Sequence, residues 1–235
     1  MIENIQIAFR ALAANKLRSV LTMLGIIIGV GAVVALMSIG NGASEIITSQ
    51  VEGIGSNLIQ VIPGRVFDGG RPGETEITLL TYGDYLALEA NRANLAGISP
   101  IYQSQQTVRY SDQSFRSSVS GVTEEFLEVR AYSMKNGRFI SNTDRRAEAR
   151  VVVLGSQTSQ DLFGGLNPVG RKLKVGGLNF EVIGVLEAKG GSGFASADDI
   201  LLIPLETGYG KLFGTAATGG GDYLVSTISI SAESS

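Results

Sequence analysis

The chain has 235 residues, of which 44% are hydrophobic and 17% charged, and its net charge is −3. It contains no Cys and no His, which excludes disulfide frameworks, thiolate or imidazole metal sites, cysteine nucleophiles and Ser-His-Asp chemistry. The negative net charge argues against a general nucleic-acid binder, and the charged fraction is low against the roughly 25% of typical soluble domains.

The first eighteen residues carry an apolar pattern of helical spacing. Ile2, Ile5, Phe9 and Leu12 follow one another at intervals of three, four and three residues, which places them on one face of a helix. One interpretation is a short amphipathic helix that lies along the membrane surface and turns at Asn15. The other is that these residues form the first turns of one longer helix.

A long uncharged segment follows. No charged side chain occurs between Arg18 and Glu45, and the apolar centre of the segment runs from Val20 to Gly40. A bilayer core of about 30 Å requires roughly 20 helical residues, so this segment predicts a transmembrane helix. The two rival interpretations, a buried core helix and a cleaved signal peptide, both fit a shorter apolar segment better.

The charges that flank this segment predict its orientation. Residues 1–18 hold three basic and one acidic residue, a net charge of +2, whereas the remainder has a net charge of −5. The positive-inside rule therefore places the N-terminus in the cytoplasm and the larger part of the chain on the outer side of the cell (inner) membrane.

Small residues line one side of the predicted membrane helix. Gly25 and Gly29 form a GxxxG motif, and Ala32 continues the same face. Small residues allow close approach of helix backbones in lipid, which predicts packing against other membrane helices or a second copy. The alternative is that glycine is simply common in membrane helices.

Beyond Gly40 the pattern predicts that the helix continues as a stalk, about Ala43 to Glu52, and stops at Gly53 or Gly55. The chain therefore divides into three parts: an amphipathic segment (1–18), a transmembrane helix with its stalk (19–55) and an extracytoplasmic domain (56–235).

The first half of the outer domain predicts short strands and capped helices. A Thr81-x-x-Asp84 capping box indicates a helix over 81–90, and Thr123 can cap a short helix over 124–129. Residues 66–75 predict a loop. Strands are expected over 57–62, 107–110 and 114–122.

The second half continues in the same way. Ser156 can cap a helix that reaches Phe163, and Gly176-Gly177 indicates a hairpin between the strands 172–175 and 180–186. Further strands are expected over 151–154, 199–204 and 224–231, and a helix over 206–212. Strands and helices alternate without a regular βαβ rhythm, which indicates an α+β fold in two lobes at most.

Motifs that resemble catalytic or nucleotide sites are weak. Residues 165–172 approach a phosphate-binding loop, but Arg171 and Lys172 stand where Lys and Ser or Thr are needed. The adjacent carboxylates Glu124-Glu125 and Asp198-Asp199 should diverge into solvent. We therefore predict no catalytic, cofactor-binding or metal-binding residues in this chain.

The order of these segments resembles that of the MacB-type ABC transporter permeases, in the wider FtsX/LolCDE-like group. The resemblance rests on specific stretches: residues 15–42, 55–64, 120–144, 151–186 and 199–214. It implies a MacB-like periplasmic core domain of two mixed lobes between the first and second membrane helices. It also implies an efflux or export role in which motion is transmitted mechanically.

The resemblance further implies partners and a place. ATP is bound by a cytoplasmic ABC ATPase subunit, and no Walker A motif occurs in this chain. A second permease copy, membrane lipid and a periplasmic adaptor are the other expected partners, and the expected location is the cell (inner) membrane. Permeases of this group carry a further FtsX-like membrane domain, so the chain is expected to be a truncated permease.

A second hypothesis explains the membrane segment and the outer domain equally well. A single-pass, membrane-anchored binding or adhesion domain needs no further membrane helices. The amphipathic N-terminal pattern and the stalk favour the permease.

Overall fold

The computed structural model describes residues 15–54, 57–67, 75–77, 79–93, 95–189, 197–214 and 222–232. The chain divides into two compact units, Met1–Ser49 and Gln50–Ser235, and each is considered by itself. The predicted amphipathic face of Ile2, Ile5, Phe9 and Leu12 lies outside the described residues.

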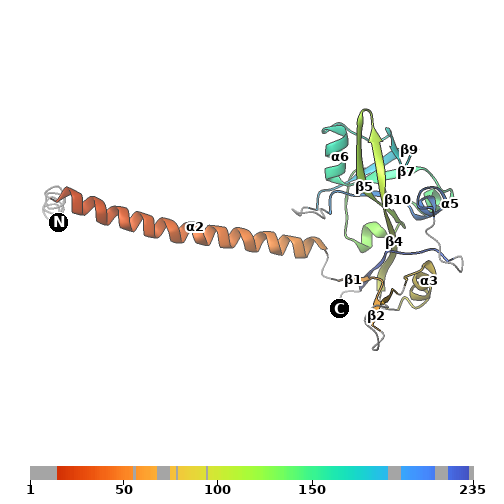
Figure 1. The fold of residues 1–235 in the computed structure, drawn as a ribbon, viewed down its shortest axis with the longest axis horizontal. Coiled ribbons are helices and arrows are strands. Elements are labelled where there is room, and N and C mark those ends of the chain that lie inside the picture. Colours follow the sequence, from red (N-terminus) through yellow and green to blue (C-terminus); the bar gives the residue numbers. More distant parts are fainter. Residues whose placement is uncertain are drawn as a thin grey trace. The chain divides into compact units, whose positions relative to one another are not determined.

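The first unit is dominated by one helix, α2 (Lys16–Ile54), which follows a turn at Asn15 (Figure 1). At 1.5 Å per residue its 39 residues extend for about 58 Å. The helix ends where the sequence predicts, next to Gly53 and Gly55. The hydroxyl of Thr22 donates to the backbone carbonyls of Arg18 and Ser19 in the preceding turn, so this polar group is satisfied within the helix.

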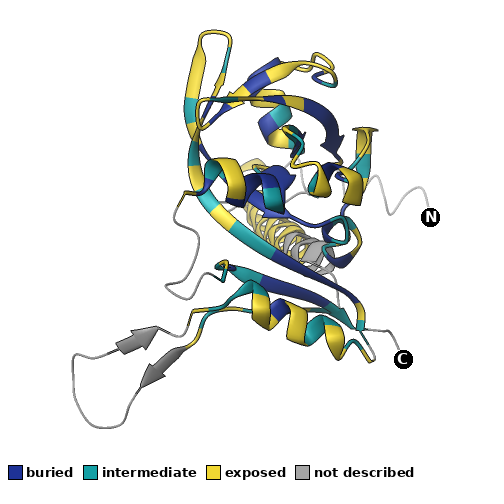
Figure 2. Cartoon of the chain, turned by 90° about the vertical axis from the view of Figure 1, so that its right-hand side faces the viewer, coloured by how far each residue is buried: buried dark blue, intermediate teal, exposed yellow. Residues whose placement is uncertain are grey.

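In the second unit, a small lobe forms from three strands and one helix. Strand β1 (Leu58–Val61) pairs with β11 (Thr227–Ala232), and β11 pairs with the first part of β4 (Leu95–Tyr110). Helix α3 (Tyr82–Ala90) packs on this sheet, and Figure 2 shows its outer side exposed. The core between helix and sheet consists of Tyr85, Ile98, Val225, Ile228 and Ile230.

The capping box of α3 forms as predicted. The Asp84 amide donates to the Thr81 hydroxyl, and the Thr81 amide donates to the Asp84 carboxylate. The loop predicted over 66–75 was wrong at both ends. There, β2 (Arg65–Phe67) and β3 (Thr75–Ile77) pair as an antiparallel ladder.

Strand β4 connects the small lobe with a large lobe. Its first part pairs with β11, and its second part pairs with β5 (Gln113–Val122) from Tyr102 to Tyr110. The sequence predicted only the last four residues of this strand, because the preceding stretch carries few of the alternating apolar residues that indicate a strand.

The large lobe completes a sheet whose strand order is β1-β11-β4-β5-β10-β7-β9-β6, with β8 joining β4 and β9. The remaining strands are β6 (Met134–Gly137), β7 (Val151–Leu154), β8 (Lys172–Val175), β9 (Leu178–Leu186) and β10 (Leu201–Pro204). The predicted hairpin forms between β8 and β9, with positive φ angles of 56° and 86° at Gly176 and Gly177. Parallel and antiparallel pairs are mixed in this sheet, as an α+β fold requires.

Four short helices surround this sheet (Figure 1). They are α4 (Phe126–Val129), α5 (Asn142–Arg146), α6 (Ser156–Phe163) and α7 (Leu205–Thr207), and α7 continues as the π-helix η1 (Gly208–Leu212). Two predicted caps are wrong. The Thr123 hydroxyl pairs with Ser99 instead, and Gly155 rather than Ser156 is the N-cap of α6.

Candidate functional site

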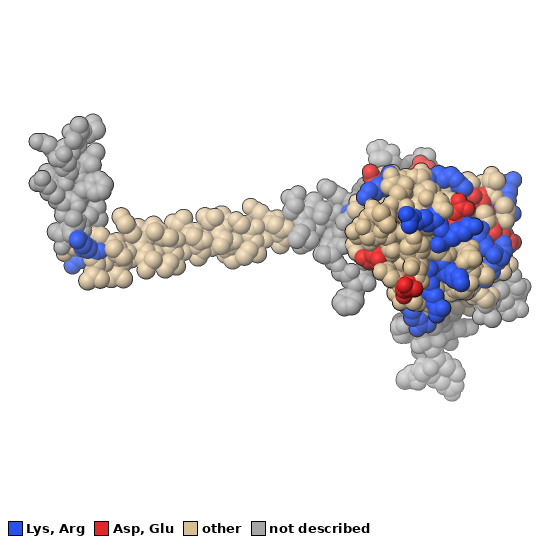
Figure 3. Space-filling view, turned by 90° about the horizontal axis from the view of Figure 1, so that it is seen from above, with Lys and Arg blue, Asp and Glu red and all other residues tan. Residues whose placement is uncertain are grey.

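Helix α2 is apolar on every side. Within Lys16–Ser44, the most apolar window of 18 residues has a mean hydropathy of 2.6, and none of that window is buried. Figure 3 shows a surface without charge along the described part of this helix beyond its basic N-terminal end. A helix without a polar face requires lipid or other apolar helices around it.

The three predicted packing residues lie on one face of α2. Gly25 and Gly29 are one helical turn apart, and Ala32 follows three residues later. A Cβ atom added at either glycine would meet nothing within 4 Å. The face is therefore open to a neighbouring helix, and packing on it stays a prediction.

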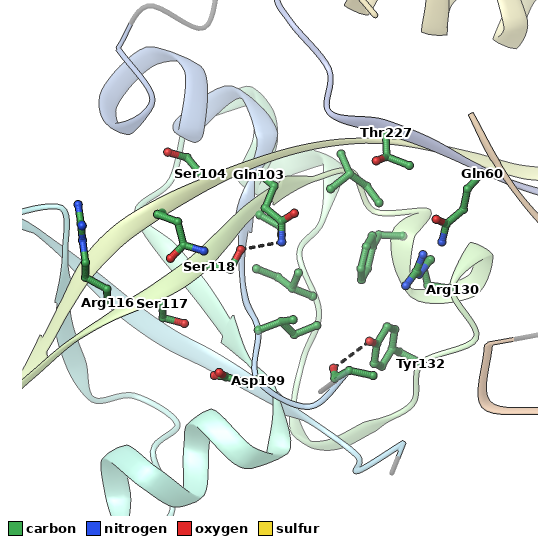
Figure 4. Close-up of a pocket in the computed structure, with 17 residues that line it drawn as sticks. Gln60, Gln103, Ser104, Arg116, Ser117, Ser118, Arg130, Tyr132, Asp199 and Thr227 are labelled. Atoms are coloured by element: carbon green, nitrogen blue, oxygen red, sulfur yellow. Dashed lines mark hydrogen bonds between the residues drawn. The ribbon is translucent and has the colours of Figure 1, made fainter. Parts of the chain in front are cut away.

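In the second unit, a trough of about 670 Å³ lies beside β4 and β5 (Figure 4). Its walls carry amide, hydroxyl and guanidinium groups, and its apolar part comes from several elements. The polar residues are Gln60, Gln103, Ser104, Gln105, Arg116, Ser117, Ser118, Ser120, Arg130, Tyr132, Asp199 and Thr227, and the apolar ones are Ile101, Phe126, Ala197, Ile200 and Leu202.

Positive charge predominates in this trough. The single carboxylate on its wall, Asp199, accepts a hydrogen bond from the Thr158 hydroxyl at 2.9 Å. Tyr132 donates to the Ala197 carbonyl at 2.9 Å, and burial raises the pKa of its hydroxyl although the nearby Arg130 charge opposes that shift. Lys189 lies 4.3 Å from the centre of the same ring.

A second polar cluster connects helices of the large lobe. The Arg145 guanidinium of α5 donates to the Glu124 carboxylate at 2.5 Å and to the Glu206 carboxylate of α7 at 2.6 Å. Burial alone would lower the pKa of Arg145, but the hydrogen bonds that it donates to both glutamates raise it. The same guanidinium keeps the pKa of Glu124 below its ordinary value in spite of partial burial.

This cluster also reaches the small lobe. Tyr82, the first residue of α3, packs against the cores of both lobes, and its pKa is raised by burial against the opposing charge of Arg145. The negative charge of Glu206 also raises the pKa of the Tyr82 hydroxyl. The Arg145 cluster therefore lies where the two lobes meet.

On another side of the joint, Glu125 performs a similar role. Its carboxylate accepts two hydrogen bonds from Arg92, which follows α3, and one from the Ile98 amide of β4. A Cβ atom at Gly97 would lie only 2.7 Å from the Val129 side chain of α4, so glycine permits this close approach. The two lobes are thus joined by two ion clusters and a tight packing contact.

The adjacent carboxylates Glu124 and Glu125 do diverge, but they are not a solvated face. Each binds a different arginine, because neighbouring side chains before α4 point in different directions. Asp198 and Asp199 diverge as well: Asp198 accepts from the Lys189 amide and Asp199 from Thr158. Asp199 is exposed as expected, but the expectation of solvent was wrong for the buried Asp198 and the half-buried Glu124 and Glu125.

The loop that approaches a phosphate-binding motif offers no phosphate cradle. The Gly170 amide donates to the Val182 carbonyl, and the Val169 amide donates to the Asn167 side chain. These N–H groups are therefore occupied. Among the described residues, no group of three or more metal-ligating side chains comes together.

Sequence reasoning missed the arginines that organise the outer unit. These are Arg92, Arg130 and Arg145, which lie in segments whose patterns indicate only loops or short helices. The glutamates that Arg92 and Arg145 bind are 21 to 61 residues away in the sequence. The only signal for these arginines in the sequence was the residue type itself. It does not identify a partner without the fold.

The chain matches one protein family along almost its whole length. A sequence profile of the MacB-like periplasmic core domain matches residues 19–235. Relatives include proteins named "Macrolide export ATP-binding/permease protein MacB" from Bdellovibrio bacteriovorus, 35% identical over 91% of this chain, and Rhodospirillum rubrum, 38% identical over 90%. The chain covers about a third of those relatives, 33% and 32% of their lengths.

Solved structures share the fold. The periplasmic region of MacB from Actinobacillus actinomycetemcomitans superposes with a TM-score of 0.60 at 22% identity, covering 78% of each chain. The extracellular domain of the transporter YknZ from Gram-positive bacteria superposes with a TM-score of 0.58 at 21% identity, covering 76% of this chain and 85% of that one.

Proposed function

Because the chain belongs to the family of MacB-like periplasmic core domains, we propose that it supplies a membrane helix and the outer domain of an ABC transporter permease. In this proposal the permease drives export or extraction of a substrate on the outer side of the membrane. The single observation that carries the proposal is the family match over residues 19–235, which includes both the apolar helix and the outer domain.

The proposal assigns a role to each part of the chain. Residues 1–18 lie on the cytoplasmic side, 19–55 form the membrane helix with its stalk, and 56–235 form the outer domain. The net charge of +2 before the helix supports this orientation in the cell (inner) membrane. An ATPase subunit or domain outside this chain binds and hydrolyses ATP, and no residue of the chain performs covalent chemistry.

The joint between the lobes suits mechanical transmission. A domain that passes on the displacement of a helix must resist bending between its own lobes. The Arg145 cluster stiffens that joint at one point, and the Glu125 cluster with the adjoining contact at Gly97 stiffens it at another. A partner that moved the domain would still need different affinities for its two positions.

The face of Gly25, Gly29 and Ala32 would pack against a second permease copy or another membrane helix. A cysteine at Gly29 should cross-link two copies by oxidation in membranes. A cysteine at Val34, which lies on the opposite side of the helix, is the matched control and should not. Cross-linking at Val34 alone would place the contact on the other face.

The orientation can be tested directly because the natural chain has no Cys. A single thiol at Asn167, an exposed residue of the outer domain, should react with a membrane-impermeant maleimide in intact spheroplasts. A single thiol at Gln6 should react only after the membrane is permeabilised. The opposite pattern would contradict the proposed topology and with it the permease role.

The alternative of an anchored adhesion domain predicts no ATPase partner. Purification of the full chain from its native membrane, followed by mass spectrometry, should recover an ABC ATPase under the proposal. Recovery of the chain with extracellular ligands and without any ATPase would favour the alternative.

A further inference from the structure

Strand β5 has an open edge beside the trough. From Gln113 to Gly121, β5 pairs with β4, but on its other side β10 pairs only with Val119–Val122. Within the described residues, no strand pairs with this side of Gln113–Ser118. At about 3.4 Å per residue, the open edge extends for roughly 20 Å.

The opening has a structural cause. The segment that leads into β10 is held by the start of α6: the Gly155 amide donates to the Ile200 carbonyl, and the Gln157 amide donates to the Asp198 carbonyl. The backbone before Leu201 is therefore directed toward α6 instead of along β5. The trough fills the space between this segment and the open edge.

The trough lies against the edge of β5 and not only against one of its faces. Arg116, Ser117 and Ser118 are consecutive, and all three line it. Asp199, Ile200 and Leu202, on the β10 side of β5, line the same trough, so it reaches the open edge of the strand. An unpaired strand edge presents main-chain donors and acceptors that another strand can use.

The walls of the trough favour acidic side chains. Figure 4 shows Arg116 toward one end and Arg130 toward the other, with Tyr132 and Gln60 near Arg130. Outside the trough, Arg109 of β4 lies directly opposite Lys174 of β8 and adds further positive charge to the same sheet.

Between the two arginines, the trough offers places for apolar side chains as well. Ile101, Phe126 and Leu202 come from three different elements and border it. An extended peptide presents its side chains alternately to two sides, so the set that faces the trough can meet both these apolar residues and the guanidinium groups.

From these observations we propose that the open edge of β5 at Gln113–Ser118 binds an extended acidic segment of a partner protein by strand addition. Main-chain hydrogen bonds to β5 supply affinity, and Arg116 and Arg130 select carboxylate side chains. The proposal does not depend on the transport activity of the complete permease, and its test measures binding alone.

The test uses the full chain in nanodiscs of neutral phosphatidylcholine. The probe is a fluorescein-labelled hexapeptide of alternating Val and Glu, followed by fluorescence anisotropy. We expect saturable binding, with hydrogen exchange of the amides of residues 113–118 slowed in the complex. A hexapeptide with Lys in place of Glu should bind at least tenfold more weakly, and so should the Glu peptide with alternate amides N-methylated.

The variants separate the site from general electrostatics. Arg116→Glu should weaken binding at least tenfold, whereas Arg150→Glu, the same charge change at an exposed residue outside the trough, should alter it less than twofold. Circular dichroism of both variants checks that the fold is retained.

Three results would overturn the proposal. Equal binding of the N-methylated peptide would exclude strand addition, and equal loss from both variants would exclude a local site. The third is binding of anionic phosphatidylglycerol vesicles, sensitive to Arg116→Glu, without binding of the Glu peptide, which would identify a lipid surface instead.

Discussion

Helix α2 and the outer domain use the same apolar side chains against different surroundings. In α2 the isoleucines, valines and leucines between Leu17 and Ile39 are all largely exposed, whereas in the outer domain such residues form three buried clusters. The helix satisfies its backbone internally, and in the proposed membrane position its apolar surface contacts lipid. The domain must satisfy both its backbone and its apolar surface through contacts between distant segments.

The two regions also treat charge differently. No charged residue occurs in α2 between Arg18 and Glu45, because an isolated charge in lipid is costly. The outer domain contains partly buried charges that are held by partners of opposite sign, as Arg145 is by Glu124 and Glu206. Tolerance of charge in the helix depends on depth, and in the domain it depends on partners.

The largest effect is expected from a charge placed in the helix. Ile27→Lys should reduce membrane insertion, since the change costs about 3 to 4 kcal/mol on insertion scales. Ile62→Lys, at a residue of the outer domain that is 65% exposed, is the matched control and should insert normally. Carbonate extraction of membranes measures both. Normal insertion of Ile27→Lys would remove the distinction between the two regions.

The next effect concerns the joint between the lobes. Arg145→Met should lower the free energy of unfolding by about 2 to 3 kcal/mol, because two partly buried glutamates lose their partner. All seven tyrosines lie in the outer domain, so near-UV circular dichroism during thermal unfolding follows that domain and not α2.

The same cluster supplies a control. Adding Glu124→Gln and Glu206→Gln to Arg145→Met should recover part of the loss, because the carboxylates no longer remain unpaired. If the triple variant were less stable than Arg145→Met, the cluster would act through packing and not through charge.

The third effect is a dependence on pH at Asp144. Hydrogen bonds from Arg138, at 2.6 Å and 3.0 Å, hold the pKa of this carboxyl well below its ordinary value of 3.8 in spite of burial. The unfolded chain therefore binds the proton more readily. The stability that Asp144 contributes is present above the unfolded pKa and is lost as the pH falls through and below it.

Asp144→Asn should accordingly cost about 2 kcal/mol at pH 7, and this difference from the natural chain should shrink as the pH falls from about 5 to below 3. Thermal unfolding of both chains across that range measures it. A difference that is constant with pH would mean that the carboxylate charge contributes nothing.

The long apolar helix and the local features of the domain could be predicted from the sequence. An uncharged apolar segment, the Thr81 and Asp84 capping box and the Gly176-Gly177 hairpin depend on residues close together in the chain. Their physical causes are contained within a few turns of backbone. Each was found where the pattern placed it.

Features that depend on distant residues could not be predicted in this way. The length of β4 is set by pairing with β11, more than 120 residues later, and the partners of Arg145 come from α7 and from the segment before α4. The trough exists because α6 holds the segment before β10, which no local pattern indicates. Only the fold brings these groups together.

The smallest effect is expected where a single buried hydroxyl has one partner. Tyr209 of the π-helix η1 donates to the Leu224 carbonyl at 2.7 Å and stacks on Tyr223. Tyr209→Phe keeps the stacked ring but leaves that carbonyl without its donor, which should cost about 1 kcal/mol. Tyr110→Phe removes an exposed hydroxyl that contacts Arg171 and should change stability by less than about 0.5 kcal/mol. Equal losses from the two variants would show that burial does not decide how much a hydroxyl contributes to the stability of this domain. The Tyr209 hydroxyl, which donates to a distant segment, would then differ little in importance from the Thr22 hydroxyl, which donates within its own helix α2.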